Sequence, residues 1–205
     1  MAPQTAYSLA PNAGQAGLLY GNERSNCDIV TGIAGAIIPP GAICEFVSVS
    51  GQYVAFPLKD TGTTTTFTPA YCGIALMDSV GAEQTYVPFA VPNVGAGSTF
   101  AGYPIGATVG FVRRGTIWTL WDGNTNVALP FPMGAMNVLH SSTGAHAQGV
   151  VTTIVPQTTA GNEIDALGGA FQLYDPRQVS GTYTDAFGTT VNIVVMKVNL
   201  PGSAA

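Results

Sequence analysis

Apolar and polar positions along this chain alternate in short runs, and no long stretch keeps the spacing of an amphipathic helix. Runs rich in Val, Ile, Phe, Tyr and Thr are separated by turns of Gly, Pro, Asn and Thr, at intervals of roughly 8 to 15 residues. This rhythm is typical of an antiparallel sandwich, jelly roll or barrel. The expected strands are residues 43–49, 52–58, 71–77, 84–90, 109–112, 116–121, 127–131, 136–140, 149–155, 170–174 and 191–198.

The strongest hairpin pattern lies in residues 103–123, which hold both tryptophans and two of the six basic residues. Two β-prone runs flank Arg113-Arg114-Gly115, so we expect a tight glycine turn there. Arginines in an exposed turn can form bidentate contacts with carboxylates of another subunit, and arginine is enriched at interfaces. We therefore expect Arg113 and Arg114 to lie in an interface.

Strand alternation in the same stretch divides its apolar side chains between two faces. We assign Val109, Phe111 and Trp118 to the core. Trp121 then points to the opposite face, where it needs a second cover, either a loop, the N-terminal arm or a partner. Trp121 is therefore a further interface candidate.

The pattern divides the chain into an N-terminal arm (1–31), one β-sandwich domain (32–199) and a short tail (200–205). The arm is rich in Ala, Pro, Gln, Asn and Gly and cannot form a core of its own. It is either a loose tail or an extended arm that docks on a neighbouring subunit through Leu18, Leu19 and Tyr20. Within the domain we expect one helical turn at 163–167 and a loop at 182–188.

Charged residues make up only 8% of the chain, against roughly 25% in a typical soluble domain. Such a surface suits a protein that is covered by an assembly. The net charge of −5 argues against nucleic-acid binding, and no apolar run reaches the ~20 residues of a membrane span. The N-terminus does not resemble a signal peptide, so synthesis in a cytoplasm is expected. Cys27, Cys44 and Cys72 have no CxxC spacing, which predicts buried free thiols.

Catalytic and metal-binding patterns are missing from the sequence. His140 and His146 are six apart in a Ser/Thr/Gly loop, which fits neither a strand nor a helix metal pair. No GxSxG or phosphate-binding loop occurs, and residues 122–133 lack the glycine and the acidic residue that a calcium loop needs. Glu163 and Asp165 fit an exposed turn better than an acid/base pair. We expect no enzyme activity, cofactor or metal.

Four motifs carry a resemblance to a known family: GLLYG at 17–21, IPPGAIC at 38–44, YCGIAL at 71–76 and YPIGATVGFVRRGTIWTLWDG at 103–123. Together they resemble the structural cement, or decoration, proteins of tailed-bacteriophage heads. The resemblance covers residues 17 to 123 and no motif in the rest of the chain.

The resemblance implies an all-β, antiparallel jelly-roll-like β-sandwich with an extended N-terminal arm and long loops. It also implies a non-enzymatic homo-oligomer that is made in the host cytoplasm. Both a homodimer and a homotrimer fit the resemblance, and we favour the homodimer. In the virion it would bind the phage major capsid protein on the outer face of the head. An alternative is a carbohydrate-binding domain of a tail or fibre adhesin, in which Trp121 would form an aromatic platform beside three polar residues: Asp122, Asn124 and Asn126.

Overall fold

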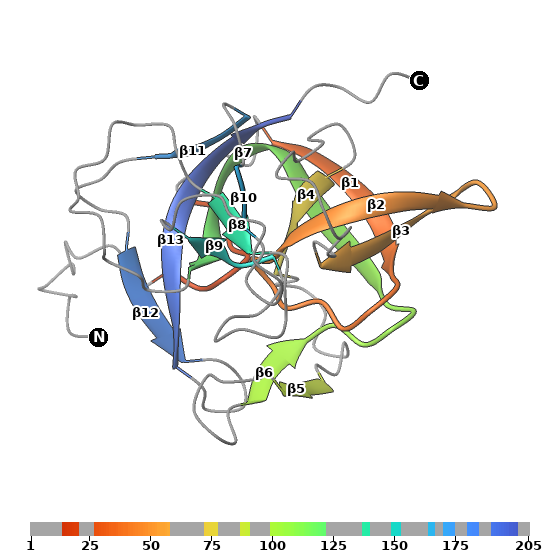
Figure 1. Ribbon diagram of the computed structural model, residues 1–205, viewed down its shortest axis with the longest axis horizontal. Helices are drawn as coiled ribbons and strands as arrows, with labels where there is room; N and C mark the ends of the chain where they lie inside the picture. Colours follow the sequence, from red (N-terminus) through yellow and green to blue (C-terminus); the bar gives the residue numbers. More distant parts are fainter. Residues whose placement is uncertain are drawn as a thin grey trace, which may run out of the picture.

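The computed structural model describes residues 14–20, 27–57, 72–77, 87–90, 99–121, 137–139, 149–152, 164–166, 170–174, 180–184 and 190–200. This part of the chain contains thirteen strands and no α-helix, which confirms the all-β class (Figure 1). The strands are β1 Asp28–Ala34, β2 Ile43–Val49, β3 Gln52–Pro57, β4 Cys72–Ala75, β5 Val87–Ala90, β6 Thr99–Gly102, β7 Thr108–Trp121, β8 Asn137–Leu139, β9 Val151–Thr152, β10 Ile164–Ala166, β11 Phe171–Leu173, β12 Ser180–Thr184 and β13 Thr190–Asn199.

Five of these strands close a barrel. Hydrogen bonding runs in the order β1, β3, β2, β4 and β7, and β7 returns to pair with β1. Strands β1 and β3 are parallel, and every other neighbouring pair in the ring is antiparallel. Closure removes the open edges that a flat five-stranded sheet would expose.

Strand β7 is the longest of the described strands and connects the barrel to the other strands of the same eleven-stranded sheet. Its first half pairs with β1 and β4 in the barrel, and its second half pairs with β13 from Asn192 to Asn199. Successive backbone carbonyls of a strand point to opposite edges. The carbonyls of Gly110, Thr116 and Trp118 accept bonds from Leu76, Tyr20 and Gly17, so β4 and residues 17–20 share one edge. The other edge is shared by β1 and β13.

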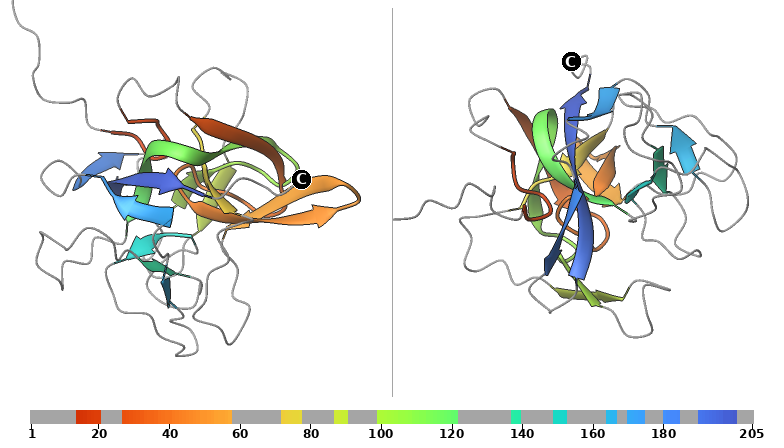
Figure 2. Two further views of the ribbon diagram at one scale, coloured as in Figure 1. Left: turned by 90° about the horizontal axis from the view of Figure 1, so that it is seen from above. Right: turned by 90° about the vertical axis from the view of Figure 1, so that its left-hand side faces the viewer.

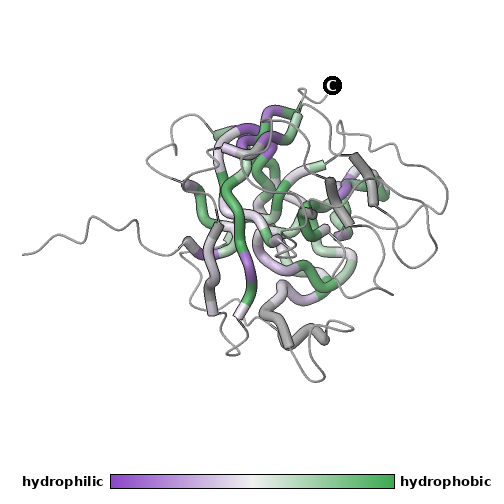
Figure 3. Tube along the Cα trace, turned by 60° about the vertical axis from the view of Figure 1, so that its left-hand side comes forward, coloured by the Kyte–Doolittle hydropathy of each residue, from purple (hydrophilic) through white to green (hydrophobic). Residues whose placement is uncertain are grey.

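The barrel interior is filled by aromatic rings packed against small residues. Phe111 is fully buried, and its ring meets that of Phe46 edge to face with centroids 4.9 Å apart. A Cβ on Gly73 would lie 2.9 Å from the Phe111 Cβ, and one on Gly32 would lie 3.3 Å from its ring. Glycine at these two positions makes room for the ring. Hydrophilic positions occupy only short stretches of the strands (Figure 3).

The remaining strands extend this framework. Strands β11 and β12 both pair with β13, while β8, β9 and β10 form a ladder that joins β7 through the pair of Val151 with Trp121. Strands β5 and β6 form a separate two-stranded sheet (Figure 2). The chain after β6 is fixed by Tyr103, whose backbone bridges to Ile38 and whose hydroxyl donates a 2.7 Å hydrogen bond to the Leu76 carbonyl.

The sequence pattern predicted several of these strands correctly. The hairpin expected from residues 43–49 and 52–58 is confirmed as β2 and β3, joined by a two-residue turn in which Ser50 and Gly51 have φ of 51° and 79°. Strands β4, β5, β8, β9, β11 and β13 lie within or over the predicted ranges. The strand predicted at 127–131 lies outside the described residues.

Three local predictions are wrong. Residues 113–115 do not form a turn, because β7 continues through them without reversing. Ile164–Ala166 forms strand β10, paired with β8, where a helical turn was expected. Strand β12 extends to Thr184, into the loop expected at 182–188. Residues 113–115 and Ile164–Ala166 pair with strands that are distant in sequence, and this pairing decides their conformation. Strand β12 instead forms a hairpin with the strand that follows it, β13.

Strand β1 begins at Asp28, inside the segment expected as an arm, and continues into the predicted domain. Residues 14–20 bond to β7 of the same chain, with Leu19 bridging to Ile117. These two stretches of the predicted arm therefore belong to the folded domain. Leu200, the first residue of the predicted tail, is buried and donates its backbone N–H to the Arg113 carbonyl, so it also belongs to the folded domain. The other residues of the tail, and the remaining residues of the arm apart from Cys27, lie outside the described residues.

Candidate interaction surface

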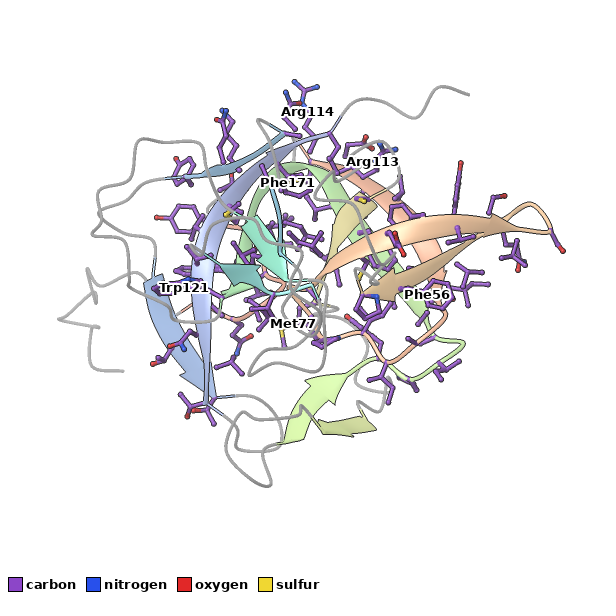
Figure 4. All side chains as sticks on the ribbon, viewed as in Figure 1. Phe56, Met77, Arg113, Arg114, Trp121 and Phe171 are labelled. Atoms are coloured by element: carbon purple, nitrogen blue, oxygen red, sulfur yellow. The ribbon has the colours of Figure 1, made fainter. Side chains whose placement is uncertain are left out.

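Arg113 and Arg114 lie in the middle of β7, next to each other but in different environments. Arg113 is 4% exposed, and the side chain of Arg114 is exposed and points away from the barrel (Figure 4). The expectation that both lie in an exposed turn is therefore wrong. A contact between Arg113 and another subunit stays a prediction, and its burial leaves Arg114 as the arginine that a partner can reach.

The burial of Arg113 places it among polar groups of the barrel wall. Glu45 of β2 is paired with Cys72 of β4 in the sheet. The charges of both Glu45 and Arg113 act on the thiol of Cys72. The pKa of Cys72 is raised to about 12, mainly by burial and secondly by the charge of Glu45, while Arg113 acts in the opposite direction. Burial likewise raises the pKa of Cys44 well above its ordinary value, with Cys72 and Glu45 adding to the effect. Both thiols stay protonated at neutral pH and are poor nucleophiles.

The three cysteines are free, as the sequence predicted. Cys44 and Cys72 are buried, whereas Cys27 is only partly buried. A Cβ on Gly115 would lie 3.0 Å from the Cys27 Sγ, and Gly115 has a φ of 138°. Glycine at 115 therefore serves the backbone of β7 and the close approach of Cys27, which explains its presence without a turn.

The exposed cations of the described residues gather on one part of β7 and β13. Arg114 is opposite Asn199 and Thr116 is opposite Lys197, so Arg114 and Lys197 lie on the same face, a diagonal pair of neighbours. Both side chains are exposed. On the same edge of β7, Asp28 of β1 is also opposite Arg114. We call Arg114 and Lys197 the basic spot, and it carries two positive charges beside one carboxylate.

Leu18, Leu19 and Tyr20 pack against the core of their own chain. The Tyr20 ring contacts Trp118 edge to face at 5.7 Å and Tyr174 at 5.3 Å between centroids. In this structure the three residues contact β7 and the core of their own chain. Their docking on a neighbouring subunit stays a prediction. Trp118 is 8% exposed, and Val109 and Phe111 are also buried, as expected for core residues.

Trp121 lies at the end of β7 and is only partly buried. Its Nε1 is a buried donor that has no hydrogen-bond acceptor among the described residues. Trp118 and Trp121 are three positions apart, so they point to opposite faces of the strand, as the alternation predicts. The polar residues expected beside Trp121 in a sugar site lie outside the described residues, so this interface candidate stays a prediction.

The hairpin of β2 and β3 was not singled out from the sequence as a contact surface. Val47, Val49 and Tyr53 are 45%, 50% and 46% exposed on it. A signal was present, because residues 46–58 contain no charged residue although strands that face water usually carry some. We call β2 and β3 together with their turn the hairpin arm.

The described residues hold no group of three or more His, Cys, Asp or Glu that could bind a metal ion. The part of the chain that the structure describes also contains no helix long and apolar enough to cross a membrane. His140, His146 and Glu163 lie outside the described residues, and of Asp165 only the backbone is described, in β10. No protein-family model matches the sequence, and a search of curated proteins finds no significant match.

Proposed function

We propose that this chain is a structural cement protein of a tailed-bacteriophage head. In this role it binds the major capsid protein on the outer face of the shell and bridges neighbouring subunits. It would have no enzyme activity and need no cofactor. The four motifs between residues 17 and 123 that resemble this family are the starting point of the proposal.

The observation that carries the proposal is the distribution of charge. Only 8% of residues are charged, and the two exposed cations among the described residues lie together in the basic spot. A protein whose surface is buried in an assembly needs few surface charges for solubility. A pair of cations on a neutral surface gives such a protein a defined contact for acidic groups of its partner.

Stabilisation of the shell would come from many weak contacts acting together. Each copy would link adjacent capsid subunits, so modest affinities add up through multivalency. We also propose that the full chain forms a jelly-roll-like sandwich and assembles as a homodimer. Support for a second layer comes from β7, which leaves the barrel and enters a sheet with β11, β12 and β13.

The proposal is tested by mixing the purified chain with phage heads that lack decoration and sedimenting them. We expect the wild-type chain to sediment with the heads, with an affinity that falls as salt is raised, because the basic spot is exposed. Arg114→Ala and Lys197→Ala should each weaken binding at least about fivefold without changing the melting temperature.

The matched control is Asp28→Asn, which also changes one exposed charge beside the basic spot but in the opposite direction. It should leave binding to the heads unchanged or make it tighter. A chain that does not sediment with heads, but gives a signal on a glycan array that Trp121→Ala abolishes, would replace the cement function with the carbohydrate-binding alternative.

A further inference from the structure

The hairpin arm extends beyond the barrel. Figure 1 and the left view of Figure 2 both show β2 and β3 projecting past the other strands of the described chain. Among the described residues, β2 pairs with β4 only through Ile43, Cys44 and Glu45, and β3 pairs with β1 only through Val54 and Ala55. The outer part of the arm is therefore a two-stranded ribbon, and an isolated ribbon of two strands is marginally stable in water.

Both faces of this ribbon carry exposed apolar side chains. Val47 and Val49 lie on one face, and Tyr53, opposite Ser48, lies on the other. All three are between 45% and 50% exposed. An antiparallel sheet normally keeps at least one face polar where it meets water. The exposed apolar side chains of the ribbon are consequently suited to contact with another polypeptide.

The outer edge of β2 also has unpaired backbone groups. Val49 and Gln52 close the two-residue turn, so the backbone groups of Val47 and Val49 face β3 and those of Phe46 and Ser48 face outward. No described residue bonds these outward groups. Outward N–H and C=O groups at a sheet edge are a template for pairing with an extended polypeptide strand, which is the kind of occupant that suits this edge.

Natural edge strands are usually protected by lysine, proline or a bulge. The arm has none of these from residue 46 to residue 56, and it contains no charge that would select a partner of opposite sign. An uncharged edge is complementary to a second copy of itself, and two antiparallel copies of one edge form a closed two-fold interface. This chain has a net charge of −5, and two copies that meet through the uncharged arm bring no like charges together at the contact.

We propose that two copies of this chain associate through the outer edge of β2, in antiparallel register about Ser48. The two-fold axis passes beside Ser48, so Val47 of one copy lies opposite Val49 of the other copy. The contact extends the sheet across the dimer and covers Val47 and Val49 on one face. The inference gives a surface to the proposed homodimer and does not depend on a capsid partner.

The test is sedimentation equilibrium of the full chain alone, over roughly 1 to 100 μM, the range of weak to moderate dimers. The wild-type chain should dimerise. The double variant Val47→Lys, Val49→Lys places lysines opposite each other across the axis and should weaken the dimer at least about tenfold. Its thermal melt verifies folding.

The register is tested by charge exchange. The double variant Val47→Glu, Val49→Glu should also be monomeric, but an equimolar mixture of the two double variants should form a heterodimer, because each lysine then faces a glutamate. Ile105→Lys is the matched control, since Ile105 is 69% exposed outside the arm. It should leave dimerisation unchanged.

Three results would overturn the proposal: a wild-type chain that is monomeric throughout this range, an Ile105→Lys variant that dissociates as the arm variants do, or a mixture that stays monomeric. Each of these is independent of binding to heads. Loss of the dimer with retained sedimentation on heads would leave the cement function standing, and the reverse result would leave the arm interface standing.

Discussion

Arg113 is buried and Arg114 is exposed, although the two arginines are consecutive residues of one unbroken strand. Alternation along β7 sends the two side chains to opposite faces. Arg113 lies near Cys72 and Glu45 in the barrel wall, whereas Arg114 shares a face with Lys197. The pair therefore combines a structural residue with a residue available for contact.

Substituting the two arginines separates stability from binding. Arg113→Ala removes a buried cation near Cys72 together with its long apolar stem, and should cost roughly 2 to 5 kcal/mol of unfolding free energy. Arg114→Ala removes an exposed side chain and should change the free energy of unfolding by less than about 0.5 kcal/mol. Urea unfolding monitored by circular dichroism measures both variants. Equal stabilities for the two variants would contradict the environments described for them.

The buried thiols predict a loss of stability at high pH. In the unfolded chain a thiol ionises near its ordinary value of 9.0, but Cys72 in the folded chain holds its proton to about pH 12. Between these values the folded state binds more protons than the unfolded state, so the free energy of unfolding falls as pH rises. Below pH 9 this contribution is constant. The slope approaches about 1.4 kcal/mol per pH unit for one thiol, and Cys44 adds to it.

The measurement is urea unfolding of the wild-type chain and of Cys44→Ala, Cys72→Ala from pH 8 upward. The double variant should be less stable at pH 8, because it creates small cavities, but should lose less stability per pH unit above 9. Cys27→Ala is the control, since that thiol is only partly buried. A slope identical in the wild-type chain and the double variant would show that these thiols do not ionise on unfolding.

The β-rich character of the chain could be predicted from the sequence because it depends on local composition. The β2–β3 hairpin was also predictable, since Ser50-Gly51 supplies the positive φ of a two-residue turn between two β-prone runs. The same reasoning gave a wrong turn at Arg113-Arg114-Gly115, because a glycine between two β-prone runs there has the same sequence pattern as the Ser50-Gly51 turn. There Gly115 accommodates Cys27, and the partners of β7 are distant strands that no local pattern reveals.

The candidate contact surface was predictable only in part. Arg114 and Trp121 were identified by residue type, because arginine and tryptophan dominate interface hot spots. Lys197, the neighbour of Arg114 in the basic spot, was not identified from the sequence, because its proximity to Arg114 depends on the pairing of β7 with β13. Likewise, the exposure of Val47 and Val49 follows from how far the hairpin arm extends beyond the barrel, which composition does not encode.

Phe46 connects the hairpin arm to the barrel core. Its ring lies 4.9 Å from Phe111 and 6.1 Å from Tyr53 between centroids, so it joins the buried ring to the exposed one. Phe46→Ala should cost roughly 3 to 5 kcal/mol and lower amide-exchange protection in the arm more than in β7. Phe46→Leu, which keeps most of the volume, should retain that protection. A uniform loss of protection over all strands would mean that the arm is not a separate cooperative unit.

Gly17 should be more sensitive to substitution than a glycine of similar backbone conformation elsewhere. Gly17 and Gly106 have φ of 82° and 86°, but a Cβ at Gly17 would lie 2.7 Å from the Met77 backbone nitrogen, whereas one at Gly106 would meet nothing within 4 Å. Gly106→Ala should therefore cost only the backbone strain of about 1 kcal/mol. Gly17→Ala adds a clash that displaces residues 17–20 from β7. For a chain of this size each kcal/mol corresponds to about 2 to 4 °C of melting temperature.

Displacement of residues 17–20 also has a spectroscopic consequence. The backbone of Gly17 and Leu18 is hydrogen bonded to Trp118, and the Tyr20 ring packs on its indole. Gly17→Ala should therefore shift tryptophan emission to longer wavelength as water reaches Trp118, while Gly106→Ala should leave the emission unchanged. Equal melting temperatures and equal emission for the two variants would contradict the view that residues 14–20 form part of the folded domain. A shift found for Gly17→Ala alone would establish the segment as the cover of Trp118, which a purely loose tail could not provide.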